Sequence, residues 1–311
     1  MKRIAAGGGM WAVLLLMGTV LALAKPVFLT WGNLSNVLQQ IATNTVLACG
    51  MTFVIATGGI DLSVGSILAF CGVVMGDLMH RGLPVALSVA TGLLCGCVVG
   101  AVNGLCVSVG KVPPFVATLG AMSALRGLAF LYTDGANITI FPDSFTYIGS
   151  GYVMLGRVPV PVSGMAAMGV VLVGQMVMAQ TALGRYMQAI GANEQAVRLA
   201  GVPLWKYKTL AYAVCGFTAA VGGALVAARL NSAQPRAGIG YELDAIAAVV
   251  IGGNSLSGGK GSLTASLAGA LIIGVLRNGL NLSNVSSFVQ EIVIGSVIVV
   301  SVMVDQLRRA R

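Results

Sequence analysis

The order of apolar and polar positions divides the chain into long apolar runs separated by short polar segments. A helix needs about 20 mostly apolar residues to cross the hydrocarbon core of a bilayer. The runs predict ten candidate transmembrane segments, at residues 10–30, 35–57, 62–79, 83–108, 112–132, 159–180, 208–230, 243–253, 263–281 and 285–305. Because 243–253 is too short to span alone, it is either a half-helix completed by flanking residues or a re-entrant segment.

Composition favours a membrane protein and excludes other classes. Of the 311 residues, 57% are hydrophobic and only 9% are charged, whereas about a quarter of a soluble domain is charged. The chain lacks the Gly-X-Y period of collagen and the alternating segments of a membrane β-barrel. The predicted fold class is an all-α integral membrane protein with about ten spanning or half-spanning helices in a single domain over residues 1–311.

The basic residues predict the orientation of this domain. The net charge is +9, but the 18 Lys and Arg residues are spread over short loops and form no face for nucleic acid. With a cytoplasmic N-terminus, eleven of them fall on the inner side and four on the outer side, which predicts that both termini are cytoplasmic. The first segment also resembles a cleavable signal peptide, with Ala22-Leu23-Ala24 as cleavage site. Retention as a span is favoured because the apolar run continues to Leu29.

Several kinds of chemistry find no support in the residues. The six cysteines lie in apolar stretches without a C-x-x-C pair, so they are interpreted as packing residues. His80 is the only histidine, which excludes a metal site built on imidazole. No G-x-x-x-x-G-K-[ST] loop for phosphate is present either. We therefore expect no catalytic residue, no metal and no cofactor on this chain.

Glycine patterns suggest how the helices pack and where they break. Gly92, Gly96, Gly100 and Gly104 lie on one helix face and predict close helix contact. The pattern G-G-x-x-L-S-x-G occurs at residues 58–65 and again at 252–259. If this similarity is more than coincidence, it predicts an internal repeat, which would be parallel if 243–253 crosses the membrane.

Gly58-Gly59 also predicts a break before the third segment, where Asp61 and Ser63 would cap the next helix. Alternatively, this broken helix lines a translocation path. Arg126 and Glu291 lie within apolar segments, where an ionisable group is costly. They are expected to pair with other spans or across a subunit interface, or else to contact a substrate.

The longest polar stretch on the predicted inner side, about residues 181–207, reads as a short amphipathic helix. Ala192, Ala196, Leu199 and Ala200 could share one face, and Gly201 with Pro203 would end the helix. The small residues of this face favour docking into a protein groove over lying on the membrane surface.

Four motifs carry a resemblance to a known family. They are N-L-S-N-V-L-Q-Q at 33–40, I-A-T-G-G-I-D-L-S-V-G-S at 55–66, V-P-P-F-V-A-T-L-G at 112–120 and G-A-N-E-Q-A-V-R-L-A-G-V at 191–202. In these the chain resembles the permease subunits of ATP-binding-cassette (ABC) importers for sugars, in the branch that serves ribose, xylose, arabinose and galactose. The resemblance extends over nearly the whole chain.

The resemblance implies a function and partners. The chain would be the permease subunit of a bacterial inner-membrane importer that carries a monosaccharide into the cytoplasm, with ribose as the favoured substrate. It would pair with a second copy or a like subunit, dock on cytoplasmic ATPases that use the ATP, and receive sugar from a periplasmic binding protein. The outer loop at about 133–158, with Phe141, Phe145, Tyr147 and Tyr152, is expected to receive that protein or to form an interfacial aromatic belt.

The resemblance also suggests site residues. By the family pattern, the loop that couples the permease to the ATPase contains Gly191, Asn193, Glu194, Ala196 and Gly201, although Glu194-Gln195-Ala196 departs from the Glu-Ala-Ala of the wider ABC class. Candidates for the translocation path or its gate are Asp61, Ser63, Asn44, Asn103, Phe115 and Thr118. Five polar residues could offer hydrogen bonds to a sugar, but the predicted topology does not place them at one depth; they are Asn44, Thr57, Asn103, Thr118 and Asn278.

Two other classes of protein compete with this interpretation. An ion-coupled secondary transporter of small polar solutes needs ion-binding or proton-relay groups in its own spans, and only Asp61 and Glu291 could serve. An intramembrane enzyme needs a cluster of catalytic groups that the sequence does not show.

Overall fold

The computed structural model describes residues 2–156 and 158–309, with the side chains of 2–8, 302 and 304–309 excepted. Helices dominate this part of the chain. They are α1 (Lys2–Ala24), the 3-10 helix η1 (Pro26–Leu29), α2 (Trp31–Ala56), α3 (Val64–His80), α4 (Val85–Ser108), α5 (Pro114–Thr133), α6 (Asp143–Ser150), α7 (Val162–Gln180), α8 (Ala182–Ala192), α9 (Glu194–Leu199), α10 (Leu204–Leu230), α11 (Tyr241–Ile251), α12 (Leu263–Leu282) and α13 (Ser287–Arg309).

The helices account for the apolar runs of the sequence. Each of the ten predicted segments contains one helix. Six of these helices, α2, α4, α5, α7, α10 and α12, are long and apolar enough to cross a membrane. The first predicted segment extends too far, because α1 ends at Ala24 and Pro26 begins η1. The segment 243–253 forms α11, which has only 11 residues.

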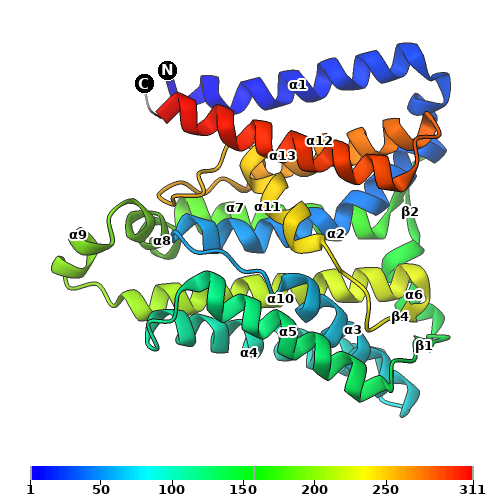
Figure 1. Cartoon of the computed structure of the whole chain (residues 1–311). Coiled ribbons are helices and arrows are strands. Elements are labelled where there is room, and N and C mark those ends of the chain that lie inside the picture. The colour runs from blue at the N-terminus through cyan, green and yellow to red at the C-terminus, as the bar shows by residue number, and fades with distance from the viewer. Residues whose placement is uncertain (1, 157, 310–311) are drawn as a thin grey trace.

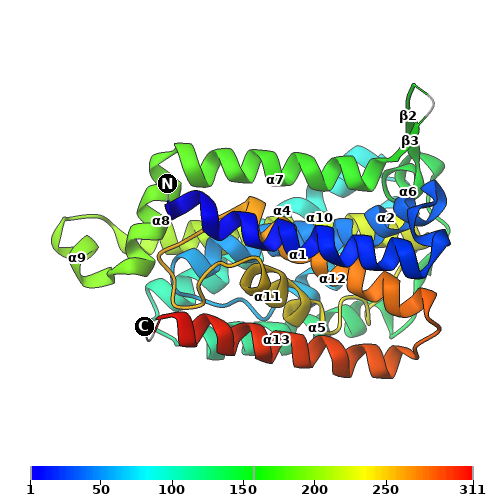
Figure 2. The same ribbon diagram turned by 90° about the horizontal axis from the view of Figure 1, so that it is seen from above.

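The helices stack in layers between two distinct ends (Figure 1). α1, α12 and α13 lie on one side, α2, α7 and α11 in the middle, and α3, α4, α5 and α10 on the other side. Both chain termini, α8 and α9 lie at one end, which we call the terminus end. The opposite end, which we call the hairpin end, carries α6 and four short strands, with β1 (Ile138–Thr139) paired to β4 (Ser232–Ala233) and β2 (Tyr152–Leu155) to β3 (Val158–Pro161). Figure 2 shows the β2–β3 hairpin projecting beyond the helices.

Proline sets the start of several helices. The residue before the helix is Pro84 for α4, Pro113 for α5, Pro142 for α6, Pro161 for α7 and Pro203 for α10. Proline lacks the N–H that a helix interior requires, and its fixed φ suits the extended residue that precedes a helix. These starts fix where each connecting loop ends.

The contact between α4 and α10 confirms the predicted glycine face. A side chain at Gly96 would meet the backbone of Gly216, and one at Gly100 would meet the backbone of Tyr212. A side chain at Gly104 would meet Thr209 of α10. Gly92 instead lies against Met75 of α3. The missing side chains therefore let the two backbones touch, as in other membrane helix pairs.

Two long helices are each followed by a non-helical segment and a shorter helix. α2 runs toward the terminus end and continues through residues 57–63 into α3, which leads to the hairpin end (Figure 1). α10 runs the opposite way and continues through residues 231–240 into α11, which leads back to the terminus end. Gly65 of α3 lies against Gly238, just before α11. The two short helices therefore begin beside each other inside the protein.

This arrangement corrects the expectation of a parallel repeat. The two G-G-x-x-L-S-x-G motifs do meet, with Gly258 next to Gly58. However, the 11 residues of α11 rise only about 17 Å at 1.5 Å each, too little to cross a core of about 30 Å. The elements correspond better in inverted order, α2–α3 with α10–α11, because these pairs run in opposite directions.

The loop at the hairpin end differs from its prediction in one respect. Phe141 and Phe145 were expected on a docking surface or in an aromatic belt, but they are 5% and 0% exposed and pack edge to face at 5.4 Å. Gly149 of α6 lies directly on the backbone of α10 at Arg229, so this part of the loop belongs to the core. Tyr147 and Tyr152 are exposed. Arg157 lies outside the described residues.

The six cysteines are free, and Cys49, Cys71 and Cys215 are buried among the helices. For these three, the interpretation as packing residues agrees with their positions. Cys106 is exposed on α4.

Candidate functional site

The break between α2 and α3 gathers four of the candidate path residues. Ser63 donates its backbone N–H and its hydroxyl to Oδ1 of Asp61, at 2.9 and 2.6 Å. Asn103 of α4 donates from Nδ2 to the Ser63 hydroxyl at 2.9 Å. Thr118 of α5 donates to the carbonyl of Ile60, within the break, at 3.4 Å. Asn103 and Thr118 were predicted to lie at different depths, whereas the fold brings both to this break.

The side chains of this cluster are buried, so in the described structure they bond to one another and to the backbone. Asp61, Ser63 and Thr118 are 0% exposed and Asn103 is 4% exposed. Asp61 accepts the N–H of Ser63, the residue before α3, instead of an N–H of the helix itself, and the Ser63 side chain makes no capping bond to α3, so the expectation that these two side chains cap the helix is wrong. The cluster holds the non-helical backbone in place. Phe115 lies outside it, at the exposed start of α5.

Arg126 of α5 hydrogen-bonds to the second break, the non-helical segment 231–240 between α10 and α11. Its Nη1 donates to the carbonyls of Pro235 and Ala237, at 2.6 and 2.7 Å, in the segment that leads into α11. The partner of this membrane arginine is thus the backbone of a non-helical segment, where carbonyls would otherwise lack donors. Glu291 of α13 is exposed and lines a second cavity beside α11, together with Asp244 and Arg277.

The polar stretch at the terminus end forms two helices instead of the one predicted. α8 ends at Ala192, and α9 begins after Asn193, whose Oδ1 accepts the N–H of Ala196 at 3.0 Å. Asn193 separates the helices because its backbone is extended and its side chain caps α9. Ala192 is therefore not on the same helix as Ala196. Gly201, with φ +76°, ends α9 as predicted.

Gly191 connects this helical hairpin to the first break and to the turn between α11 and α12. A side chain at Gly191 would collide with the end of α2 at Ala56 and with Gly259 in the turn before α12. Gly259 donates its N–H to the Ala56 carbonyl at 3.1 Å, and Gly258 lies against both Gly191 and Gly58. The contact is backbone on backbone, so a displacement of α8 must displace both turns.

The outward face of α9 is free of such contacts. Ala196 is exposed, and Leu199 is 89% exposed although it is apolar. Glu194 at the start of α9 pairs instead with Lys208 of α10 at 2.6 Å and with Arg198 at 3.3 Å. Lys208, and secondarily Arg198, lower the pKa of Glu194 below its usual value. The ion pair therefore stabilises the α9–α10 contact above the usual glutamate pKa and is lost as pH falls through the lowered one.

Replacing Lys208 by Gln is expected to loosen α9. Partly exposed ion pairs contribute about 0.2–1 kcal/mol, so opening should rise about 1.4- to fivefold. The measurement is hydrogen exchange of the amides of residues 195–199 at pH 7, with Lys206→Gln as matched control because Lys206 is exposed and forms none of the ion pairs seen in the described chain. The two variants should converge at acid pH, where Glu194 is protonated. Equal exchange at pH 7 would contradict the role of this pair.

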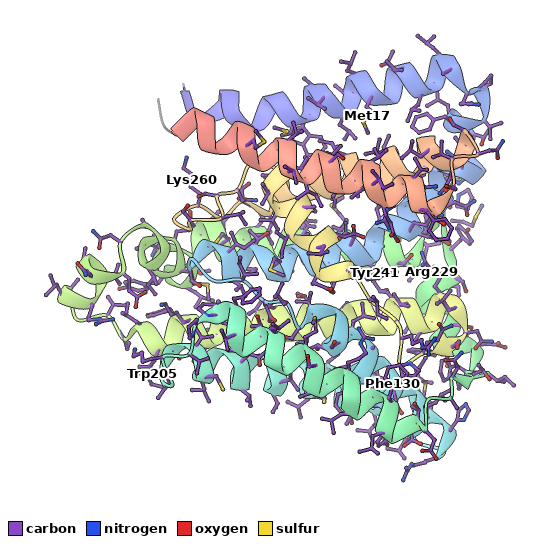
Figure 3. The ribbon with its side chains drawn as sticks, in the orientation of Figure 1. Met17, Phe130, Trp205, Arg229, Tyr241 and Lys260 are labelled. Atoms are coloured by element: carbon purple, nitrogen blue, oxygen red, sulfur yellow. The ribbon has the colours of Figure 1, made fainter. Side chains whose placement is uncertain are left out.

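A polar cavity of about 380 Å³ lies between α2, α10, α11 and α12, toward the hairpin end. From α2 it is lined by five polar residues, Asn36, Gln39, Gln40, Thr43 and Asn44. From the other helices it is lined by Arg229, Tyr241, Asp244 and Arg277, and Figure 3 shows Arg229 and Tyr241 close together in this region. Asn44 is the one candidate path residue in its wall, and its Oδ1 has no hydrogen-bond partner within the described structure.

Most residues of this cavity were not among the predicted site residues, although α2 carries a signal for them. Asn36, Gln40 and Asn44 recur every fourth residue, and with Gln39 and Thr43 they form a polar stripe on the first part of α2, whose later part, residues 46–56, is mostly apolar. Arg277 is held by Asp244, with Nη2 at 3.0 and 2.9 Å from the two carboxylate oxygens. Asn278 and Asn33 bond to each other outside this cavity, and Thr57 bonds the Val54 carbonyl.

Comparison with known proteins identifies the family. A family profile described as "Branched-chain amino acid transport system / permease component" matches residues 33–302. The chain belongs to this permease family. The resemblance seen in the sequence motifs is thereby confirmed, and the protein is a multi-pass membrane permease.

Relatives within the permease family cover nearly the whole chain. The ribose import permease protein RbsC of Haemophilus influenzae is 45% identical over 296 residues, 94% of this chain and 90% of the relative. RbsC of Escherichia coli strain K12 is 46% identical over 300 residues, 95% of this chain and 92% of the relative. The L-arabinose transport system permease protein AraH of E. coli is 35% identical over 301 residues, 97% of this chain and 90% of the relative. No solved structure matches the chain.

Proposed function

We propose that this chain is the membrane-spanning subunit of an ATP-driven importer that moves ribose into the cytoplasm. The observation that carries this proposal is the identity of 45–46% to two ribose import permeases over at least nine-tenths of both chains, against 35% to the arabinose permease. Other monosaccharides are the next candidates.

In this proposal, the terminus end lies in the cytoplasm and the hairpin end in the periplasm of a bacterial inner membrane. The excess of basic residues in the terminus-end loops supports this orientation. All ten predicted segments lie in the membrane, with α3 and α11 reaching only part of the way. Non-helical backbone at membrane depth is tolerated where protein or a water-filled cavity covers it, and residues 57–63 and 231–240 are of this kind.

The ATPase subunit is proposed to dock on α9. Among the residues assigned to the coupling loop, Gly191, Asn193 and Glu194 make contacts within the chain. Ala196 and the neighbouring Leu199 instead face outward, as expected for a helix that enters a groove of a partner. ATP would bind to the partner, and Gly191 would pass the movement of α8 to the two broken helices.

A second copy of the chain is proposed to pack against the face formed by α5, α11 and α13 (Figure 2). On this face the short helix α11 exposes Ile239 just before its start and Leu243 in its first turn, at 66% and 58%. The backbone before α11 is non-helical, and lipid cannot satisfy its polar groups. A homodimer would cover this face and enclose a sugar path. The exposed Tyr147 and Tyr152 at the hairpin end offer a surface for the sugar-binding protein.

The deciding experiment is reconstitution of the permease with its partner ATPase and sugar-binding protein. The purified chain is expected to hydrolyse no ATP alone. The full complex, with two copies of this chain by native mass spectrometry, should take up ribose only with internal ATP and external binding protein. Robust hydrolysis by this chain alone would contradict the proposal. Uptake driven by a proton or sodium gradient without the ATPase would instead favour a secondary transporter.

A further inference from the structure

We propose that the polar cavity between α2, α10, α11 and α12 binds one monosaccharide within each copy of the chain. The choice of ligand rests on the function proposed above. The site itself follows from the position, chemistry and charge of the cavity wall.

The size and position of the cavity suit a solute that enters from the hairpin end. Its volume of about 380 Å³ falls within the range of about 300–1,000 Å³ found for small-molecule sites. From Asn36 to Asn44, the polar stripe extends about 12 Å into α2 at 1.5 Å per residue. Gln39 donates from Nε2 to the hydroxyl of Tyr152 in the β2–β3 hairpin at 2.9 Å, so the upper wall lies next to the hairpin.

The wall offers the hydrogen-bond partners that a sugar needs. Each sugar hydroxyl can donate and accept, and the amides of Gln40 and Asn44 do both. Asp244 adds acceptors, Arg229 adds donors, and the Tyr241 ring adds an apolar surface for the C–H side of a sugar. Polar side chains are costly within the membrane, so a stripe of them on α2 indicates a polar occupant.

The charges of the wall disfavour an anion such as phosphate or a lipid headgroup. Arg277 is already neutralised by both carboxylate oxygens of Asp244. The first turn of α11 contains Glu242 and Asp244, which offset the partial positive charge of its N-terminus. Arg229 remains, with Nη1 3.4 Å from the carbonyl of Gln39. One arginine next to a carboxylate leaves too little positive charge to bind an anion tightly. The same pair can both donate hydrogen bonds to a neutral polyol and accept them from it.

The walls also connect ligand binding to the moving parts of the fold. The amides lie on α2, whereas Tyr241 and Asp244 lie on the short helix α11. A sugar that bridges them would hold α11 against α2 at the hairpin end. Because α2 and the turn after α11 both contact Gly191 at the terminus end, occupancy of the cavity and the position of α8 would depend on each other.

The test is equilibrium binding of radiolabelled ribose to the whole purified permease in lipid nanodiscs, without ATPase or binding protein. We expect saturable binding with a Kd of about 1 mM, since a transport site must also release its solute. Unlabelled ribose should displace the label, and inorganic phosphate should not. Asn44→Leu, which replaces the amide by an apolar side chain with the same number and branching of heavy atoms, should weaken binding about tenfold.

Two further variants distinguish a loss of sugar binding from a loss of folding. Gln40→Leu changes an exposed residue of the same stripe and should weaken binding as well, whereas Gln180→Leu changes an exposed glutamine outside the cavity and should leave binding unchanged. The absence of saturable binding, displacement by phosphate, or equal affinity of all three variants that elute as monodisperse protein would overturn the cavity site.

Uptake by the reconstituted complex separates this proposal from the proposed function. If the unmodified complex shows ATP-driven ribose uptake and both cavity variants transport at the same rate and KM, the cavity site is wrong while the function stands. If the unmodified complex does not transport ribose, the proposed function fails, whatever the cavity binds.

Discussion

Gly216→Val is expected to abolish most of the folded permease. A side chain at Gly216 would collide with the carbonyl of Gly96 and lie 3.0 Å from the backbone N and Cα of Gly100. Both neighbours are backbone of a regular helix, so neither can rotate away as a side chain could. Overpacking in a well-packed core costs about 1–3 kcal/mol, and a contact between backbones belongs at or above the upper end of that range.

Size-exclusion profiles of the fluorescently tagged protein measure this effect. Gly216→Val should lose most of the monodisperse peak or lower the temperature at which it disappears. The matched control is Gly169→Val on α7, because a side chain at Gly169 would meet no atom within 4 Å. If both variants elute like the unmodified chain, the close contact between α4 and α10 does not hold the bundle together.

Ala196→Arg is expected to block transport without affecting the bundle. Ala196 is exposed on α9, and arginine forms helices well, so α9 should persist. A long cation at the centre of the proposed docking face would disturb close packing with the ATPase. Substitutions at such central positions cost about 2 kcal/mol or more, so we expect at least a tenfold loss of ATPase co-purification or of ATP-driven uptake.

The comparison needs three measurements on the same variant, namely membrane insertion, ATPase co-purification and uptake. Ala136→Arg serves as control, because Ala136 is also an exposed alanine but lies in the loop before β1 at the opposite end. An Ala196→Arg variant that inserts normally, retains the ATPase and transports at the unmodified rate would show that α9 is not the coupling element.

Many features of this permease could be predicted from local sequence. The apolar runs located a helix in each of ten segments, since burial in lipid requires a long apolar stretch whatever its neighbours are. The four-residue spacing of Gly92 to Gly104 indicated a contact face, because only glycine lets two helix backbones touch. The motif at 191–202 carried the resemblance to the permease family, and the comparisons confirm that family.

Other features depended on residues far apart in the chain. Phe145 looked like a surface aromatic because its neighbours are polar, yet α6 folds back onto α10 and buries it. The single amphipathic helix predicted around Asn193 became two, because an Asn that caps one helix must leave the preceding one. Arg126 found its partners more than 100 residues away, in the carbonyls of Pro235 and Ala237.

The sequence by itself thus determined that the chain is a helical membrane protein, roughly where its helices lie, and to which family it belongs, since these depend on composition, short-range periodicity and motifs. Only the tertiary structure decided that α3 and α11 begin side by side, that Asp61, Ser63, Asn103 and Thr118 gather at one break, and that Asn44 faces a separate polar cavity. The physical reason is that a helix which begins inside the protein leaves backbone groups next to it that lipid cannot satisfy. Their partners come from whichever distant helices pack against them, and no local pattern specifies that choice.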